Sequence, residues 1–134
     1  MQAKSRNTKQ KRVILEVLKA TDTHPTADWI YEEARKVLPD ISLGTVYRNL
    51  RVLTENNMIQ ELNYGSSHSR YDGNPMPHYH FVCQRCQRVF DVPMEVYHQL
   101  NEQVETATGW KVEMHRLEFY GLCHDCQQEK RMRN

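Results

Sequence analysis

Two Cys-x-x-Cys pairs constrain this chain more than any other feature of its sequence. Cys83 and Cys86 form the first pair, Cys123 and Cys126 form the second, and 36 residues separate the two pairs. Two knuckles of this kind can close a tetrahedral site of four thiolates, which suits Zn²⁺ and leaves no coordination position open. A thioredoxin-like redox site would need one such motif at the start of a helix, whereas both motifs here follow strand-like runs. We therefore predict structural zinc over a redox dithiol or two unrelated buried pairs.

The part of the chain that carries these cysteines is predicted to be a small α+β lobe. A change of composition precedes it, because residues 73–77 (GNPMP) contain two prolines and one glycine and indicate a hinge. Beyond the hinge the pattern predicts two short strands, a helix and a longer strand, over residues 78–83, 88–92, 94–108 and 110–121. A lobe of this size is too small to be stable through its core alone, so a staple such as zinc or an oligomer partner is expected.

The part before the hinge is predicted to be a winged helix-turn-helix. Apolar residues at helical spacing indicate three helices, and two short strand-like runs joined by a turn-rich segment follow, over residues 8–20, 27–37, 43–56, 58–62 and 69–72. In this arrangement the third helix enters the major groove of DNA. The predicted organisation is therefore a DNA-binding domain over 1–72, a hinge over 73–77 and a second domain over 78–134.

The third predicted helix carries side chains suited to DNA. Ser42 and Thr45 at its start can donate to phosphate, helped by the positive end of the helix. Tyr47, Arg48 and Asn49 offer a ring for thymine methyl groups, a fork for guanine and an amide for adenine. The alternative is that Tyr47 belongs to the core and that Arg48 is a solvated surface charge.

The N-terminal region concentrates positive charge, although the formal net charge of the chain is only +1. Five basic residues precede any acidic one: Lys4, Arg6, Lys9, Lys11 and Arg12. This cluster is either a solvated basic tail or an arm that contacts phosphates.

Histidines and carboxylates near the hinge predict a second metal site. His78 and His80 share one face of a strand, so both imidazoles can reach one ion. Asp72 and Asp91 are carboxylates close to this strand in sequence, whereas spacing alone leaves the inclusion of His24 open. Imidazoles with carboxylates suit Fe²⁺ or Mn²⁺ better than metals that prefer thiolates.

Other function classes find less support in the sequence. The longest stretch without Asp, Glu, Lys or Arg covers 73–84, twelve residues, whereas a membrane-spanning helix needs about 20 apolar ones. The N-terminus shows no apolar segment typical of a signal peptide, which favours the cytoplasm. No arrangement of nucleophile and general base indicates an enzyme.

Five segments, in order through nearly the whole chain, resemble the ferric uptake regulator superfamily of metal-dependent, dimeric bacterial repressors. They read TKQKRVILEVL, HPTADWIY, SLGTVYRNL, HYHFVC and RLEFYGLC. The resemblance implies a homodimer that binds an AT-rich inverted repeat in double-stranded DNA. It implies that the four cysteines hold zinc and that one regulatory ion has five ligands: His24, Asp72, His78, His80 and Asp91. It also implies base contacts by Tyr47 and Arg48 and a minor-groove contact by Arg6.

The resemblance is greatest to the peroxide-sensing branch of this superfamily. That branch has Asp where many iron sensors have Glu, and this chain has Asp72 and Asp91. The implied mechanism is Fe²⁺-catalysed oxidation of His24 or His78, with Mn²⁺ giving an insensitive form. Pro77 and Tyr79 stand at positions that supply a further metal site in many iron-responsive members, so His115 is not expected to be a ligand. The alternatives are an iron-responsive repressor, a zinc- or manganese-uptake regulator and a metal-independent winged-helix protein.

Overall fold

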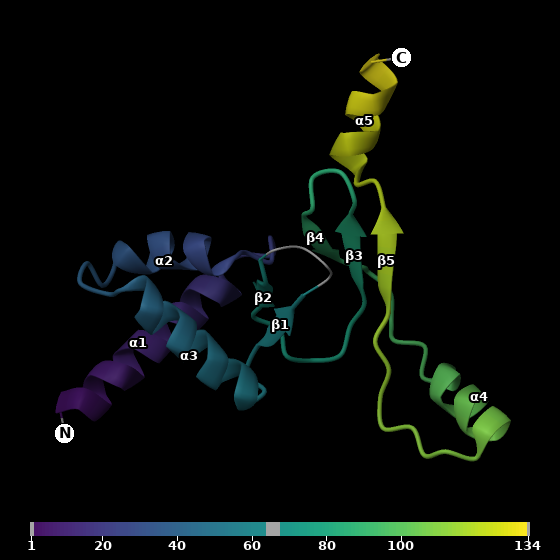
Figure 1. Ribbon diagram of the computed structural model, residues 1–134, viewed down its shortest axis with the longest axis horizontal. Helices are drawn as coiled ribbons and strands as arrows, with labels where there is room; N and C mark the ends of the chain where they lie inside the picture. The colour runs from purple at the N-terminus through teal and green to yellow at the C-terminus, as the bar shows by residue number, and fades with distance from the viewer. Residues whose placement is uncertain (1, 64–67, 134) are drawn as a thin grey trace. The chain divides into compact units, whose positions relative to one another are not determined.

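The structure is a computed structural model that describes residues 2–63 and 68–133, with side chains described for 7–63 and 68–129. The chain divides into two compact units, Met1–Pro75 and Met76–Asn134, and the division falls inside the predicted hinge segment. Figure 1 shows the elements of both units. Within the described residues no helix is long and apolar enough to cross a membrane.

The N-terminal unit is a winged helix-turn-helix. It contains helices α1, α2 and α3 and an antiparallel hairpin of strands β1 and β2, over Gln2–Lys19, Ala27–Arg35, Leu43–Glu55, Gln60–Leu62 and Arg70–Asp72. The predicted fold is confirmed, although α1 begins six residues earlier than the pattern indicated. The predicted turn between the two strands includes residues 64–67, which lie outside the described part of the chain.

Local sequence explains where α2 and α3 begin. Thr26 and Ser42 both have extended backbones, and their hydroxyl oxygens accept hydrogen bonds from the backbone N–H of Trp29 and Thr45. Such caps satisfy N–H groups that the first turn of a helix leaves without a partner. The apolar faces of the three helices then meet in one core, whose fully buried members include Ile14, Ile30 and Leu50.

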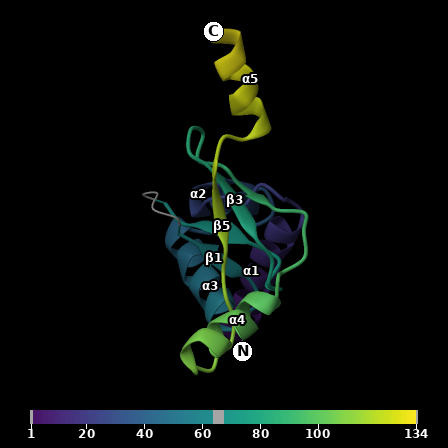
Figure 2. The same cartoon turned by 90° about the vertical axis from the view of Figure 1, so that its right-hand side faces the viewer.

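The C-terminal unit is built on a three-stranded sheet in the order β4-β3-β5. Its elements are β3, β4, α4, β5 and α5, over His80–Cys83, Val89–Asp91, Gln99–Thr108, Glu118–Gly121 and His124–Arg133. Strand β3 pairs antiparallel with β4 and parallel with β5. Figure 2 shows β3 and β5 side by side, with α5 continuing beyond the end of β5. The α+β class predicted for this unit is confirmed.

Two predicted elements of this unit are shorter in the structure, and their hydrogen bonds explain why. The helix expected from residue 94 begins at Gln99, because the N–H of Met94 bonds Val92 and the N–H of Tyr97 donates to the hydroxyl of Tyr79. The strand expected over 110–121 is regular only over Glu118–Gly121. Strand β3, its neighbour, is four residues long and its first N–H bonds the carbonyl of Leu117, so residues 110–116 have no strand beside them in the described part of the chain.

Candidate metal centres and DNA-contacting surface

The four cysteines lie together in the C-terminal unit. Their sulfur atoms are all within 4.8 Å of one another, and none is in a disulfide. The parallel pairing of β3 with β5 sets Cys83 opposite Gly121, which brings the turn after β3 close to the start of α5. Four sulfur donors in one cluster suit Zn²⁺. The prediction that the two pairs converge on one zinc-type site is therefore confirmed.

The electrostatics of this cluster favour a bound cation. Burial raises the pKa of Cys83, but hydrogen bonds from the backbone N–H groups of Cys86 and Cys123 outweigh it and lower the pKa to about 6. Burial and the neighbouring thiols raise the pKa of Cys126 to about 12. Cys83 therefore loses its proton more readily than an ordinary thiol, whereas burial and the neighbouring thiols make Cys126 hold its proton more tightly. A divalent ion removes this penalty.

Arg88, which belongs to no motif of the sequence, also contacts the cluster. Its Nε donates to Cys86 Sγ at 3.2 Å, and its Nη2 lies 3.5 Å from Cys123 Sγ. Hydrogen bonds to the two sulfurs and to Asp125 raise the pKa of Arg88 above its usual value. Its place two residues after Cys86 is the signal that could have identified it.

The same unit holds two imidazoles and a carboxylate close together. His80 in β3 stands directly opposite Asp91 in β4, and the rings of His78 and His80 have centroids 4.4 Å apart. Asp91 Oδ1 lies 2.9 Å from His78 Nε2 and 3.6 Å from His80 Nε2. Because His78 Nδ1 lies 2.6 Å from the carbonyl oxygen of Met76, which can only accept, Nδ1 carries the proton. This leaves the Nε2 of a neutral ring able to bind a metal.

The N-terminal unit holds a second imidazole–carboxylate pair. His24 Nε2 lies 3.1 Å from Asp72 Oδ2, and both side chains are buried. His24 has a φ of 53°, a left-handed conformation that is uncommon for residues other than glycine. Arg70 Nη1 donates to the carbonyl oxygen of His24 at 3.0 Å. The N–H of Tyr71 bonds the next carbonyl, that of Pro25, so β2 holds this loop in place.

The donors of both groups suit Fe²⁺ or Mn²⁺. Imidazole nitrogen and carboxylate oxygen are ligands that these ions accept, whereas thiolates are absent from both groups. In each unit the histidine presents Nε2 to the carboxylate, which is the side of the ring that would face a shared ion. The residues present therefore fit a regulatory ion of this class.

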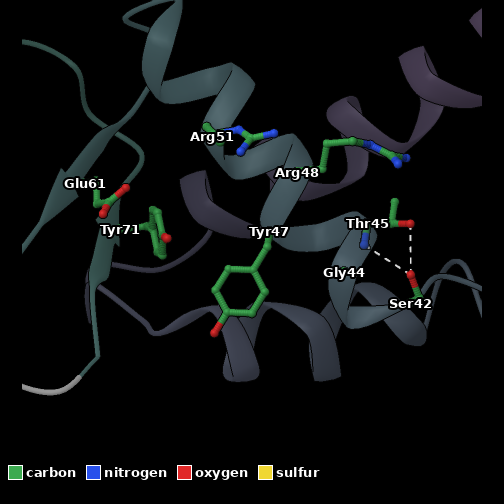
Figure 3. A pocket seen from close by; sticks show the side chains of 8 residues that line it. All are labelled: Ser42, Gly44, Thr45, Tyr47, Arg48, Arg51, Glu61 and Tyr71. Carbon is green, nitrogen blue, oxygen red and sulfur yellow. Dashed lines mark hydrogen bonds between the residues drawn. The ribbon is translucent and has the colours of Figure 1, made fainter.

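Helix α3 and the hairpin border a groove of about 630 Å³ in the N-terminal unit. Its lining residues are Ser42, Gly44, Thr45, Tyr47, Arg48, Arg51, Glu61 and Tyr71. Figure 3 shows Tyr47, Arg48 and Arg51 projecting from α3, with Glu61 and Tyr71 lining the groove from the hairpin. Tyr47 is 47% exposed, which argues against a core role for its ring. Burial, and then the charge of Glu61, raise the pKa of Tyr71 to about 12, so its hydroxyl stays neutral.

The other residues predicted to contact DNA differ from one another in exposure and in hydrogen bonding. Asn49 is 3% exposed and its amide donates to the carbonyl oxygen of Thr45, so its side chain faces inward and cannot read an adenine. This corrects the prediction for Asn49, and the reason is that position 49 falls on the buried face of α3. Ser42 is exposed but already caps the helix, and Lys11 is partly exposed on α1. Arg6 lies in α1, and its side chain is outside the described set.

Both ring nitrogens of His115 lie within hydrogen-bond distance of a neighbouring side chain, and its exclusion from the metal ligands stays a prediction. Its Nε2 lies 2.8 Å from the hydroxyl of Tyr79, and its Nδ1 lies 2.7 Å from Asn101 Oδ1. Tyr79 is almost fully buried and also accepts the N–H of Tyr97. This chain of hydrogen bonds ties α4 to the strand that carries His80.

A winged helix-turn-helix, a four-cysteine zinc-type site and imidazole–carboxylate groups suited to Fe²⁺ or Mn²⁺ define a metal-responsive DNA-binding regulator. The model of the ferric uptake regulator family matches residues 2–120, and the chain belongs to that family. The peroxide-responsive repressor PerR of Staphylococcus aureus (strain USA300) is 39% identical over 128 residues, which cover 96% of this chain and 86% of that protein.

Two solved structures agree in fold. The peroxide stress regulator of Campylobacter jejuni has a TM-score of 0.82 and 30% identity, over 93% of this chain and 94% of that one. The ferric uptake regulator of Helicobacter pylori, described as having three functional metal-binding sites, has a TM-score of 0.74 and 26% identity. That match covers 89% of this chain and 80% of the other.

Proposed function

We propose that this protein is a peroxide-sensing transcriptional repressor in which one Fe²⁺ ion is bound by His24, Asp72, His78, His80 and Asp91. The observation that carries the proposal is that each unit holds a partial ligand set of the same chemistry. The N-terminal unit supplies one imidazole and one carboxylate, and the C-terminal unit supplies two imidazoles and one carboxylate. Neither set alone fills the coordination shell of Fe²⁺ or Mn²⁺, so an ion is bound best when both sets contribute.

Such an ion would couple metal binding to DNA binding. His24 lies in the loop that precedes α2, and Asp72 ends the hairpin whose residues Glu61 and Tyr71 line the groove beside α3. An ion shared with the C-terminal unit would therefore restrict how the two units move relative to each other. Because metal binds the restricted state preferentially, it shifts the population toward the form that binds DNA.

Peroxide sensitivity is proposed to depend on the imidazole ligands. Bound Fe²⁺ would supply redox chemistry toward peroxide, whereas Mn²⁺ would occupy the same ligands without that chemistry. The side chain oxidised would be His24 or His78: a ring C–H bond becomes a C–O bond, two electrons pass from the imidazole to the peroxide, and the second peroxide oxygen leaves as water. The oxidised ring would then be lost as a ligand. The restriction on the units is released and the repressor leaves its operator. A side chain is consumed and nothing is turned over, which describes a sensor and not an enzyme.

Operator recognition is proposed to involve the exposed face of α3 and the basic residues of α1. Tyr47 and Arg48 would contact bases, whereas Arg6, Lys11, Ser42 and Thr45 would contact the backbone or the minor groove. An AT-rich inverted repeat would present one half-site to each protomer of a homodimer.

The C-terminal unit supports the dimer. Strand β5 is an edge of the sheet, so one side of its backbone has no partner strand within the described chain. No residue of α4 is buried, and Trp110, Met114 and Phe119 expose apolar side chains. A second copy that pairs with this edge would cover these residues.

The test is operator binding by zinc-containing protein loaded with either Fe²⁺ or Mn²⁺, measured before and after a peroxide pulse. We expect both forms to bind the operator, the Fe²⁺ form alone to release it, and about one oxygen atom to be added to His24 or His78. An Fe²⁺ form that keeps both its DNA and its histidines intact would contradict peroxide sensing and favour an iron-responsive repressor. Full affinity of metal-free protein would favour a metal-independent winged-helix protein.

A further inference from the structure

The guanidinium of Arg88 is held against two sulfurs of the four-cysteine cluster. Its Nε donates to Cys86 Sγ at 3.2 Å and its Nη2 to Cys123 Sγ at 3.5 Å. Nη2 also lies 3.2 Å from Asp125 Oδ2, and the guanidinium carbon lies 5.4 Å from the centre of the Phe90 ring. The carboxylate and the ring orient the guanidinium so that its N–H groups face the sulfurs.

The sulfurs that Arg88 contacts include the most accessible one. Cys86 is partly exposed, whereas Cys83, Cys123 and Cys126 are buried. An oxidant arriving from solvent therefore reaches Cys86 first. Cys86 Sγ lies 3.9 Å from Cys123 Sγ, so these two sulfurs are also well placed to form a disulfide after a small movement.

Charge explains why this contact affects reactivity. Four thiolates around a divalent ion leave a net charge of −2, and the sulfur lone pairs carry the nucleophilic character of the site. A charged N–H donor that shares those lone pairs withdraws electron density from them and offsets part of the charge. Both effects reduce the attack of sulfur on the O–O bond of a peroxide.

We propose that Arg88 protects the zinc ligands Cys86 and Cys123 from oxidation by hydrogen peroxide. In the reaction that it suppresses, Cys86 thiolate attacks the peroxide, so that an S–O bond forms, the O–O bond breaks and hydroxide leaves. Cys123 thiolate then displaces the sulfenic acid oxygen as a second hydroxide, and an S–S bond forms. Two electrons pass from the two sulfurs to the peroxide, and the site loses two of its four ligands. This inference concerns the zinc ligands alone and does not depend on how the histidines respond.

The experiment measures zinc release from full-length, zinc-loaded protein without added iron or manganese. Hydrogen peroxide is added, zinc is followed with a colorimetric chelator, and mass spectrometry locates any Cys86–Cys123 disulfide. We expect Arg88→Ala to release zinc about tenfold faster than wild type or more, as the loss of charge-assisted hydrogen bonds implies. Arg85→Ala is the matched control, because Arg85 pairs with Glu129 at 3.3 Å and lies in the same turn.

A second measurement separates chemical protection from simple stabilisation of the site. Zinc loss to excess EDTA without peroxide reports how tightly the ion is held. Protection predicts that Arg88→Ala accelerates the peroxide reaction much more than the loss to EDTA. An equal acceleration of both, or release by peroxide at the wild-type rate, would overturn the proposal.

Arg88→Lys keeps the proposal testable if Arg88→Ala fails to hold zinc. Lysine retains the positive charge but lacks the planar fork that reaches both sulfurs. We expect peroxide-driven release from Arg88→Lys to be several-fold faster than from wild type. A wild-type rate for this zinc-containing variant would show that hydrogen bonding by the fork does not protect the sulfurs.

Discussion

His24 and Asp72 are 48 residues apart in the chain, yet His24 Nε2 lies 3.1 Å from Asp72 Oδ2 in the buried interior of the N-terminal unit. Strand β2 creates this contact. It ends in Asp72, and through Arg70 and Tyr71 it also binds the carbonyl groups of His24 and Pro25. The loop that carries the histidine and the strand that carries the carboxylate are thus one hydrogen-bonded structure.

Arg70→Ala is expected to weaken metal binding without removing a ligand. The guanidinium of Arg70 holds the His24 carbonyl while His24 adopts a left-handed conformation, and without this support the loop can relax. Loss of such a supporting contact typically lowers metal affinity by about 10–100-fold. Titration of the variant with Mn²⁺, followed by electron paramagnetic resonance, measures this. Arg35→Ala is the control, because Arg35 pairs with Glu32 on the exposed side of α2, and equal affinities for the two variants would contradict the prediction.

Arg48→Ala is expected to reduce binding to the specific operator by roughly 1–3 kcal/mol if Arg48 reads a base. Lys11→Ala should instead weaken binding to all DNA sequences. It should also make the slope of log K against log salt concentration shallower by up to about one unit, as expected for a phosphate contact. Titrations of operator and random DNA at several salt concentrations distinguish the two. If Arg48→Ala lowers the affinity for operator and random DNA equally, Arg48 contacts phosphate and does not read a base.

Asp91→Glu is expected to separate metal binding from peroxide sensitivity. Glutamate keeps the charge and the oxygen donor, so metal-dependent DNA binding should survive. The longer side chain can crowd the position where peroxide would meet iron, since Asp91 is 46% exposed and lies beside His78 and His80. Mass spectrometry after a peroxide pulse should show much less oxidation of His24 and His78 than in wild type. If His24 or His78 is oxidised as much in this variant as in wild type, the length of the Asp91 side chain does not control peroxide sensitivity.

Gln87→Gly is expected to stabilise the protein. Gln87 follows Cys86 with a φ of 64°, a conformation that glycine adopts without the steric cost of a Cβ atom. Relief of this strain is worth about 1 kcal/mol, reduced somewhat by the greater freedom of glycine in the unfolded chain. Asn57→Gly is the comparison, because Asn57 has a φ of 58° but asparagine tolerates this region better. Thermal melting of both zinc-loaded variants should show a rise for Gln87→Gly only.

The sequence alone determined the features that depend on near neighbours in the chain. Thr26 and Ser42 act as helix caps because a hydroxyl two or three residues ahead of the first free N–H groups can reach them. Cysteine pairs with two residues between them indicate a zinc-knuckle turn wherever they occur, and the alternation of a strand places His78 and His80 on the same face. Features of this local kind were enough to predict the winged helix and the zinc-type cluster.

Only the tertiary structure decided which side chains meet across the fold. Arg88 also contacts Cys123, in addition to its near neighbour Cys86, because the pairing of β3 with β5 brings Cys123 near the turn that carries Cys86. Asn49 turns inward because packing of α3, and not its chemistry, sets which face of the helix is exposed. Residues 110–114 have the alternation of a strand, but a strand needs a neighbour to accept its hydrogen bonds. The hydrophobic periodicity of a segment indicates which secondary structure it can form, whereas the residues it contacts depend on the fold of the whole chain.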